Sequence, residues 1–343
     1  MKEKMKNKIN KNETKKKSVQ VSNKKGSITL FVLFSGLFFI MFLSTVLMYG
    51  AIKRQTEEEA TKQAQELYGK QDEEEVYQQY FAEGAIPIYT KEQLAKIGSD
   101  EYVVVNEMGG LRYKFTTDGY YILMGDIELG GSPENRNWVP IGSQGKPFTG
   151  TLEGNGYVLY NLYNQNIGEN YQGLFGYTQG ASVQNITIES GQIQGKQYCA
   201  GLIGQGENTT IENIINKAQV QVTEGMSGGV IGWTNGEVIG CENYGEITSS
   251  GYANDVKDTF IGGVAGYVDK GAQITKCINN ADITAQYSCI GGVIGYSEGK
   301  IKEAVNNGAI TVTGQNINKD ATMGGVVGYI KQNEIEDCTN TGK

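Results

Sequence analysis

The stretch GGVIGYSEGKIKEAVNNGAI, residues 291–310, contains two short motifs that the chain repeats. The first is a glycine-flanked tag, Gly-x-x-Gly followed by an aromatic residue in all copies but one, at 173–177, 201–205, 229–233, 263–267, 292–296 and 325–329. The closing glycines lie 28, 28, 34, 29 and 33 residues apart. Such a spacing indicates a repeat architecture rather than a compositional bias.

The second motif follows each tag and combines β-branched residues with a central asparagine. It is clearest at 238–247, 274–283 and 301–310, fits 211–220 and 335–342, and fits 183–193 loosely. Its apolar runs are cut every few residues by Gly or Asn, which predicts strands too short to be helices.

A unit of this length cannot bury its own apolar face, but stacked copies can. We therefore predict an all-β fold, a parallel β-helix (β-solenoid) of about six coils. Stacking would place Asn243 over Asn279 and Cys241 over Cys277. Asparagine suits a repeated corner because it tolerates left-handed backbone angles and its amide can bond to the copies above and below.

The charge is unevenly distributed along the 343 residues. The net charge is −8, but residues 1–26 hold ten lysines and two glutamates, +8, which leaves −16 for the remainder. An acidic body argues against nucleic acid as its partner, since phosphate would be repelled.

The composition also limits the chemistry. The chain has no histidine, which excludes Ser/His and Cys/His nucleophiles and most zinc sites. Three of the five cysteines, Cys241, Cys277 and Cys338, share one repeat position and are predicted to be small buried hydrophobic residues. A Cys241–Cys277 disulfide is a geometric alternative. Asp255, Asp258 and Asp320 lie in insertions and are expected to be solvated, with a weak cation site as the alternative. We predict no catalytic residue, no metal and no cofactor.

The N-terminal third suggests a membrane anchor. Residues 1–26 are interpreted as a basic cytoplasmic tail, and 27–49 are uncharged and long enough to cross a bilayer as a single helix. The lysines before this segment predict that the N-terminus is cytoplasmic and that residues 50–343 are extracellular. Residues 50–83 read as a charged helical stalk or, equally, a flexible linker.

Residues 24–30, KKGSITL, resemble the leader of type IV prepilins, in which a peptidase cuts after the glycine. Phe31 stands where those pilins carry a glutamate, so the sequence favours an uncleaved anchor. A pilin-like subunit of a surface filament is the alternative function.

Residues 84–165 are predicted to be the N-terminal cap of the solenoid, and 166–343 its repeats. The cap contains a helix start, with Thr90 as N-cap, Gln93 three residues later, and Leu94 and Ile97 facing inward. Strands are expected at 102–105 and 120–129.

The order of motifs in 86–343 resembles the GLUG-motif β-helix proteins of bacterial surfaces. The matching elements are the short helix, the strand DIEL (126–129), WVPIG (138–142), FTGTLEGNGY (148–157) and the repeated GLFG-type tags. The resemblance implies a parallel β-helix displayed outside the cell, often attached to adhesins or secreted peptidases, with no catalytic residues in the motif itself.

The aromatic residue after each tag forms the candidate site. In a solenoid these positions align in a column, with Gln205 as the exception: Tyr177, Trp233, Tyr267, Tyr296 and Tyr329. A stacked ladder that stiffens the wall is one interpretation. An exposed strip that binds sugar rings is the other.

Taken together, the sequence predicts a non-catalytic, single-pass membrane protein whose extracellular solenoid is a surface adhesion or display module, with a cell-surface glycan or protein as partner. A polysaccharide-degrading β-helix is a further alternative. Because the last repeat frame stops at Lys343, the open strand edge is also expected to self-associate.

Overall fold

The computed structural model describes residues 84–105, 111–250, 259–286, 289–313, 322–331 and 334–343. The predicted tail, membrane helix and stalk lie outside these residues, as do Asp255, Asp258 and Asp320. Within the described residues, no helix has the length and apolar character needed to cross a bilayer.

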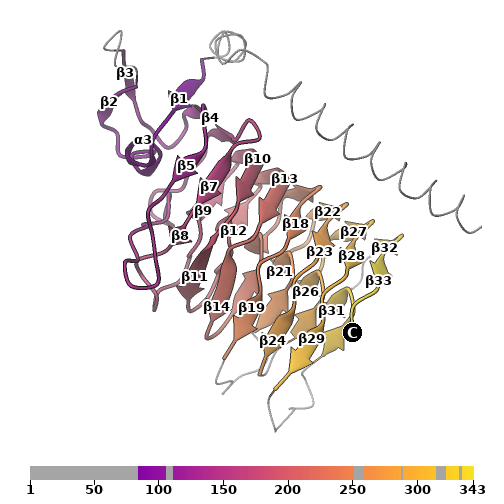
Figure 1. The fold of residues 1–343 in the computed structure, drawn as a ribbon. Coiled ribbons are helices and arrows are strands. Elements are labelled where there is room, and N and C mark those ends of the chain that lie inside the picture. Colours follow the sequence, from indigo (N-terminus) through magenta and orange to yellow (C-terminus); the bar gives the residue numbers. More distant parts are fainter. Residues whose placement is uncertain (1–83, 106–110, 251–258, 287–288, 314–321, 332–333) are drawn as a thin grey trace, which may run out of the picture. The chain divides into compact units, whose positions relative to one another are not determined.

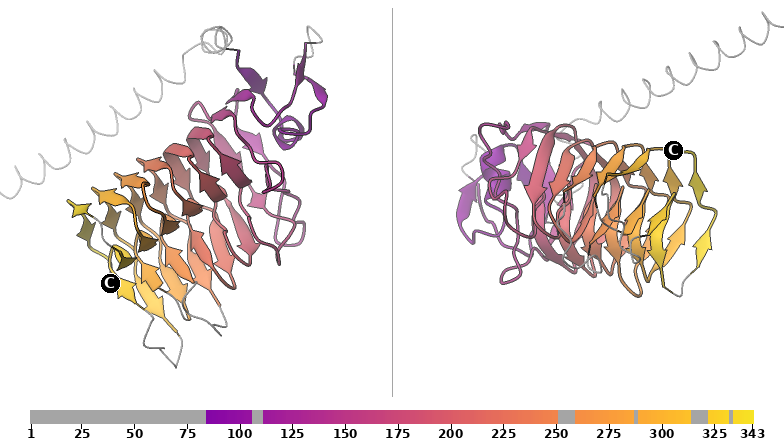
Figure 2. Two further views of the ribbon diagram at one scale, coloured as in Figure 1. Left: turned by 180° about the vertical axis from the view of Figure 1, so that it is seen from behind. Right: turned by 90° about the horizontal axis from the view of Figure 1, so that it is seen from below.

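The described chain is a parallel β-solenoid, and the predicted fold class is confirmed (Figures 1 and 2). Colours pass from purple to yellow along the stack, so each coil lies beside the coil that precedes it in sequence. The solenoid has about seven turns, against about six expected. The difference arises because the predicted cap also contributes strands that pair in parallel with the repeats.

Four parallel sheets run along the stack. The path of the first sheet is β1 (Ile86–Ile88), β4 (Tyr120–Leu123), β6 (Thr151–Glu153), β10 (Ser182–Ile188), β13 (Thr210–Asn216), β17 (Glu237–Ile239), β22 (Gln273–Thr275), β27 (Lys300–Lys302) and β32 (Ile335–Glu336). Its side strands are β5 (Ile127–Glu128), β7 (Val158–Tyr160), β18 (Glu242–Asn243), β23 (Ile278–Asn279), β28 (Val305–Asn306) and β33 (Thr339–Asn340).

The second sheet comprises β8 (Leu162–Tyr163), β11 (Gly191–Gly195), β14 (Gln219–Val222), β19 (Ile247–Ser249), β24 (Ile283–Ala285) and β29 (Ile310–Val312). The third sheet, which carries the tags, comprises β9 (Phe175–Gln179), β12 (Ile203–Glu207), β16 (Ile231–Thr234), β21 (Ala265–Val268), β26 (Ile294–Ser297) and β31 (Val327–Ile330). The fourth comprises β15 (Met226–Gly228), β20 (Phe260–Gly262), β25 (Cys289–Gly291) and β30 (Met323–Gly324).

The core is a set of columns in which identical positions of successive coils meet. Val183, Ile211, Val238, Ile274 and Ile301 form one such column, each paired with the next and almost completely buried. Alternation along a strand sends their neighbours outward. The repeat therefore buries one continuous apolar core that no single unit could close alone.

The start of the solenoid agrees with the sequence prediction. Helix α3 (Lys91–Ala95) begins at Thr90, whose hydroxyl accepts from the Gln93 backbone amide in a capping box, and Leu94 and Ile97 are buried. The strand predicted at 102–105 is β2 (Tyr102–Val104), which pairs antiparallel with β3 (Arg112–Lys114). The run 120–129 divides into β4 and β5.

The asparagine column is in register, as predicted. Asn243 pairs with Asn279 and Asn279 with Asn306. Each side chain donates to the next at 2.9 Å, and the ladder extends from Asn216 to Asn340. Each amide also bonds to its own chain two residues on, so a fully buried polar group is satisfied.

One prediction about these asparagines was wrong. The left-handed corner of each coil lies three residues earlier, at Asn185, Asn213, Gly240, Lys276, Glu303 and Asp337, all with φ between 51° and 62°. The ladder asparagines in described positions do not have positive φ. Asparagine is therefore retained in the ladder for its two-sided amide, and the turn is made elsewhere.

Candidate functional site

The five predicted aromatic residues lie in one column on the third sheet. Backbone register pairs Tyr177 with Gln205, Gln205 with Trp233, and then Tyr267, Tyr296 and Tyr329 in order. The residues two positions before them, such as Ile231 and Ala265, point into the core. The tag thus alternates a core residue, a glycine and an outward-facing ring.

Four of the five rings form a continuous stack, which we call the aromatic ladder: Trp233, Tyr267, Tyr296 and Tyr329. Successive centroids are separated by 6.5, 4.7 and 5.2 Å, and the ring planes are within 14° of parallel. Tyr177 is not part of this stack, since Gln205 occupies the intervening coil. The geometry matches the stiffening interpretation, because parallel rings at this spacing cover each other's faces.

Tyr177 belongs to a second aromatic group nearer the N-terminal end. Its ring meets Tyr171 edge-on at 5.8 Å, and Tyr171 stacks on Tyr198 at 5.0 Å. The Tyr177 hydroxyl donates to Glu207, and Gln205 Nε2 donates to that hydroxyl at 3.4 Å. Burial, reinforced by Glu207, raises the pKa of Tyr177 well above its usual range.

The sequence analysis missed Phe260. It lies on β20 of the fourth sheet, and its ring centroid is 5.4 Å from that of Tyr267 and 4.8 Å from that of Tyr296. The same register position is filled by Met226 and Cys289 in the neighbouring coils. A signal was present, because these residues all stand two positions before the glycine that opens the tag, but the variety of side chains hides the column.

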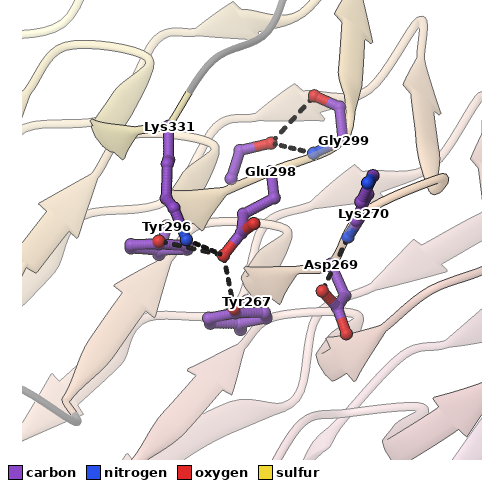
Figure 3. A network of polar contacts seen from close by, with 8 residues as sticks. Tyr267, Asp269, Lys270, Tyr296, Glu298, Gly299 and Lys331 are labelled. Atoms are coloured by element: carbon purple, nitrogen blue, oxygen red, sulfur yellow. Dashed lines mark hydrogen bonds and ion pairs between the residues drawn. The ribbon is translucent and has the colours of Figure 1, made fainter.

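A carboxylate links two coils of the aromatic ladder (Figure 3). Glu298 Oε1 accepts from the hydroxyls of Tyr267 at 3.2 Å and Tyr296 at 3.1 Å, and from Lys331 Nζ at 3.3 Å. Burial opposes ionisation, but the hydrogen bonds from Lys331, Tyr296 and Tyr267 lower the pKa of Glu298. Burial and the bond to Glu298 raise the pKa of Tyr296 to about 12.

Exposure differs along the column. Tyr177 is 8% exposed, the rings from Trp233 to Tyr296 are half-buried, and Tyr329 is 45% exposed. Stacking leaves ring edges and hydroxyl groups, rather than flat ring faces, at the surface of the middle coils. A sugar ring that packs on an aromatic face would therefore find such a face only where the stack is interrupted.

The cysteines are buried as predicted. Cys199, Cys241, Cys277 and Cys289 are buried free thiols, and Cys338 is half-buried. The thiol of Cys241 lies 3.4 Å from the Ile239 carbonyl oxygen, and that of Cys277 lies 3.5 Å from the Val238 carbonyl oxygen. Burial, with Cys277 adjacent, raises the pKa of Cys241. These thiols fill the narrow core and are poor nucleophiles there.

Among the residues whose placement is described, no three His, Cys, Asp or Glu side chains are grouped as metal ligands would be. The acidic residues of this region, such as Glu298 and Glu207, instead accept hydrogen bonds from the tyrosines.

No protein-family model matches the chain. An immunoglobulin A1 protease of Streptococcus sanguinis is 27% identical over 210 residues, which is 58% of this chain but 10% of that protein. Halomucin of Haloquadratum walsbyi is 28% identical over 175 residues, 46% of this chain and 2% of that protein. The chain therefore corresponds to a small part of each relative.

A crystal structure from Bacteroides ovatus, assigned as an immunoglobulin A1 protease, superposes with a TM-score of 0.51 at 17% identity. The superposition covers 76% of this chain and 77% of that one. The likeness extends over most of both chains, and at this identity it concerns the fold. The described residues form a β-helix related to those of immunoglobulin A1 protease-like proteins.

Proposed function

We propose that this chain is a non-catalytic surface module of the GLUG-repeat type, in which a membrane anchor at 27–49 holds a rigid extracellular β-solenoid for adhesion or display. The carrying observation is the buried asparagine ladder from Asn216 to Asn340, bonded coil to coil at 2.8–2.9 Å. Such a ladder fixes the spacing and register of every repeat. A rigid rod whose outer face repeats suits the presentation of surface groups at a distance from the anchor.

Two further observations support this role. The relatives match over only a small fraction of their length, which is the behaviour of a module carried within larger proteins. The carboxylates around the aromatic ladder are engaged by tyrosines and Lys331. We place the glycan or protein partner on the outer wall of the solenoid.

Cysteine labelling of intact cells tests the topology. Tyr244→Cys, at a side chain that is 48% exposed, is introduced into a Cys338→Ala background, where the other thiols are buried. A membrane-impermeant maleimide is expected to label it on intact cells. Ser18→Cys in the same background should react only after lysis. Equal labelling of both variants, or labelling of Tyr244→Cys only after lysis, would refute the extracellular placement.

Incubation with candidate substrates tests the absence of catalysis. The full-length chain is incubated with immunoglobulin A1 and with a panel of polysaccharides, and products are followed by mass spectrometry. We expect no cleavage and reversible retention on at least one immobilised glycan or protein of the panel. Cleavage of any substrate that is lost on Glu298→Gln would overturn the non-catalytic proposal.

A further inference from the structure

The strongest unexplained feature is the pair Tyr267 and Tyr296 with Glu298 between their hydroxyl groups (Figure 3). The two rings are separated by 4.7 Å between centroids and by 7° between planes, the closest spacing in the aromatic ladder. Ordinary wall stiffening requires stacked rings. It does not require that two phenols share one carboxylate oxygen.

The shared oxygen fixes how the rings overlap. Both hydroxyls reach Glu298 Oε1, at 3.2 and 3.1 Å, from adjacent strands paired in parallel register. The rings therefore point in the same direction, and each carbon next to a hydroxyl faces its counterpart on the other ring. Phe260 lies against both rings, 5.4 and 4.8 Å from their centroids, and holds this overlap from the side.

We propose that Tyr267 and Tyr296 form a site for oxidative cross-linking, at which a one-electron oxidant joins the two rings into dityrosine and covalently staples β21 to β26. The oxidant is hydrogen peroxide acting through a haem peroxidase. Glu298 is the proton acceptor, because it is the ionised group already bonded to both hydroxyls.

The reaction balances without any other group. Each phenol loses one electron to the oxidant and its hydroxyl proton, one at a time, through Glu298 to water. The two radicals form a carbon–carbon bond between the positions next to their oxygens. The hydrogens on those carbons then return to the oxygens and restore both aromatic rings. The protein loses two hydrogen atoms, and one hydrogen peroxide is reduced to two waters.

Tyr329 provides a route from the surface to this pair. It is 45% exposed and stacks on Tyr296 at 5.2 Å and 10°. An electron can therefore be withdrawn from Tyr329 and replaced from the half-buried rings behind it. The pair that shares Glu298 is the expected product, since it combines the shortest ring separation with the proton acceptor. Phe260 has no hydroxyl group and remains unmodified.

The experiment treats the purified full-length chain with a haem peroxidase and hydrogen peroxide at low protein concentration. We expect dityrosine fluorescence and, after digestion, one intrachain peptide that links Tyr267 to Tyr296 and is two hydrogen masses lighter than the sum of its parts. The treated protein should melt at a higher temperature. Absence of this peptide from folded, oxidised protein would overturn the proposal.

Three variants locate the chemistry. Tyr296→Phe keeps the stacked ring and should fold, but it should lose the linked peptide. Tyr244→Phe removes an exposed tyrosine outside the ladder and should leave the peptide unchanged. Glu298→Gln should slow its formation while the melting temperature at neutral pH confirms that the variant is folded. Dityrosine that persists in Tyr296→Phe, or that only links separate chains, would show that exposed tyrosines react at random and would refute the site.

Discussion

The side chain of Asn279 occupies the space that a Cβ atom on Gly263 would need. An ideal Cβ there would lie 2.2 Å from Asn279 Cγ and 2.2 Å from the backbone oxygen of Gly292. The same conflict arises for each described tag with a ladder asparagine beside it: Gly201 with Asn216, Gly229 with Asn243, Gly292 with Asn306 and Gly325 with Asn340. The two sequence motifs are therefore one packing arrangement, in which a missing side chain admits an amide.

Gly263→Ala should consequently destabilise the solenoid. The added methyl group meets backbone and a buried amide, neither of which can move without breaking the ladder. We expect a loss of about 1–3 kcal/mol in the free energy of unfolding, the usual range for overpacking. Gly125→Ala is the control, because a Cβ there has no neighbour within 4 Å. Equal denaturation midpoints for the two variants would contradict the packing argument.

Replacement of a ladder amide by a carboxylate should be more damaging in the middle of the stack than at its end. Asn279→Asp removes the donor that reaches Asn306 and the Ala281 carbonyl, and it buries a charge. We expect a loss of roughly 3–5 kcal/mol. Asn340→Asp makes the same chemical change at an exposed position and should cost less than about 1 kcal/mol. Chemical denaturation measures both, and similar losses would show that the ladder does not depend on burial.

Lys276→Gly should stabilise the protein. Lys276 has φ 55° at the corner where a neighbouring coil carries Gly240 with φ 62°. A left-handed conformation costs an ordinary residue roughly 1–2 kcal/mol, which glycine avoids, although glycine loses more entropy on folding. The expected net gain is about 0.5–1 kcal/mol. Gly240→Ala should have the opposite sign. A lower melting temperature for Lys276→Gly would indicate that the lysine side chain compensates for its strain.

Glu298 should make stability depend on pH in the acidic range. Its pKa is lowered in the folded protein, despite burial, by Lys331, Tyr296 and Tyr267. A carboxyl with a depressed folded pKa stabilises the fold above its unfolded value, about 4.3 for glutamate, and the contribution disappears as pH falls through the folded pKa. The difference in melting temperature between the native chain and Glu298→Gln should be largest near pH 7 and shrink below pH 4. A difference independent of pH would rule out ionisation as the cause.

Tyr296→Ser separates the two interpretations of the aromatic column. Removal of the central ring takes away contacts with Tyr267, Tyr329 and Phe260, and each aromatic pair contributes about 0.5–1.5 kcal/mol beyond burial. We expect a lower melting temperature with glycan retention unchanged. Tyr244→Ser, at an exposed site, should alter stability by less than about 0.5 kcal/mol. Loss of glycan retention in Tyr296→Ser, with the fold intact, would instead favour a sugar-binding strip.

The repeat spacing and the alternation of apolar residues were sufficient to predict parallel coils, the column of Asn243 and Asn279, the buried cysteines and the capping box at Thr90. These features follow from local sequence because stacking copies translates each position onto its equivalent. The aromatic column was predicted as a column, but its division by Gln205 into two groups depended on which rings stack. Phe260 escaped prediction because its equivalents in other coils are Met226 and Cys289.

The sequence by itself determined the axis of this protein: a period of 28–34 residues with one apolar face can be closed only by stacking. Only the tertiary structure decided what lies across a coil, where residues from different strands of the repeat meet. Gly263 is 16 residues from Asn279, and Glu298 is 31 from Tyr267. The path of each coil in space brings these pairs together, and sequence periodicity carries no information about that path.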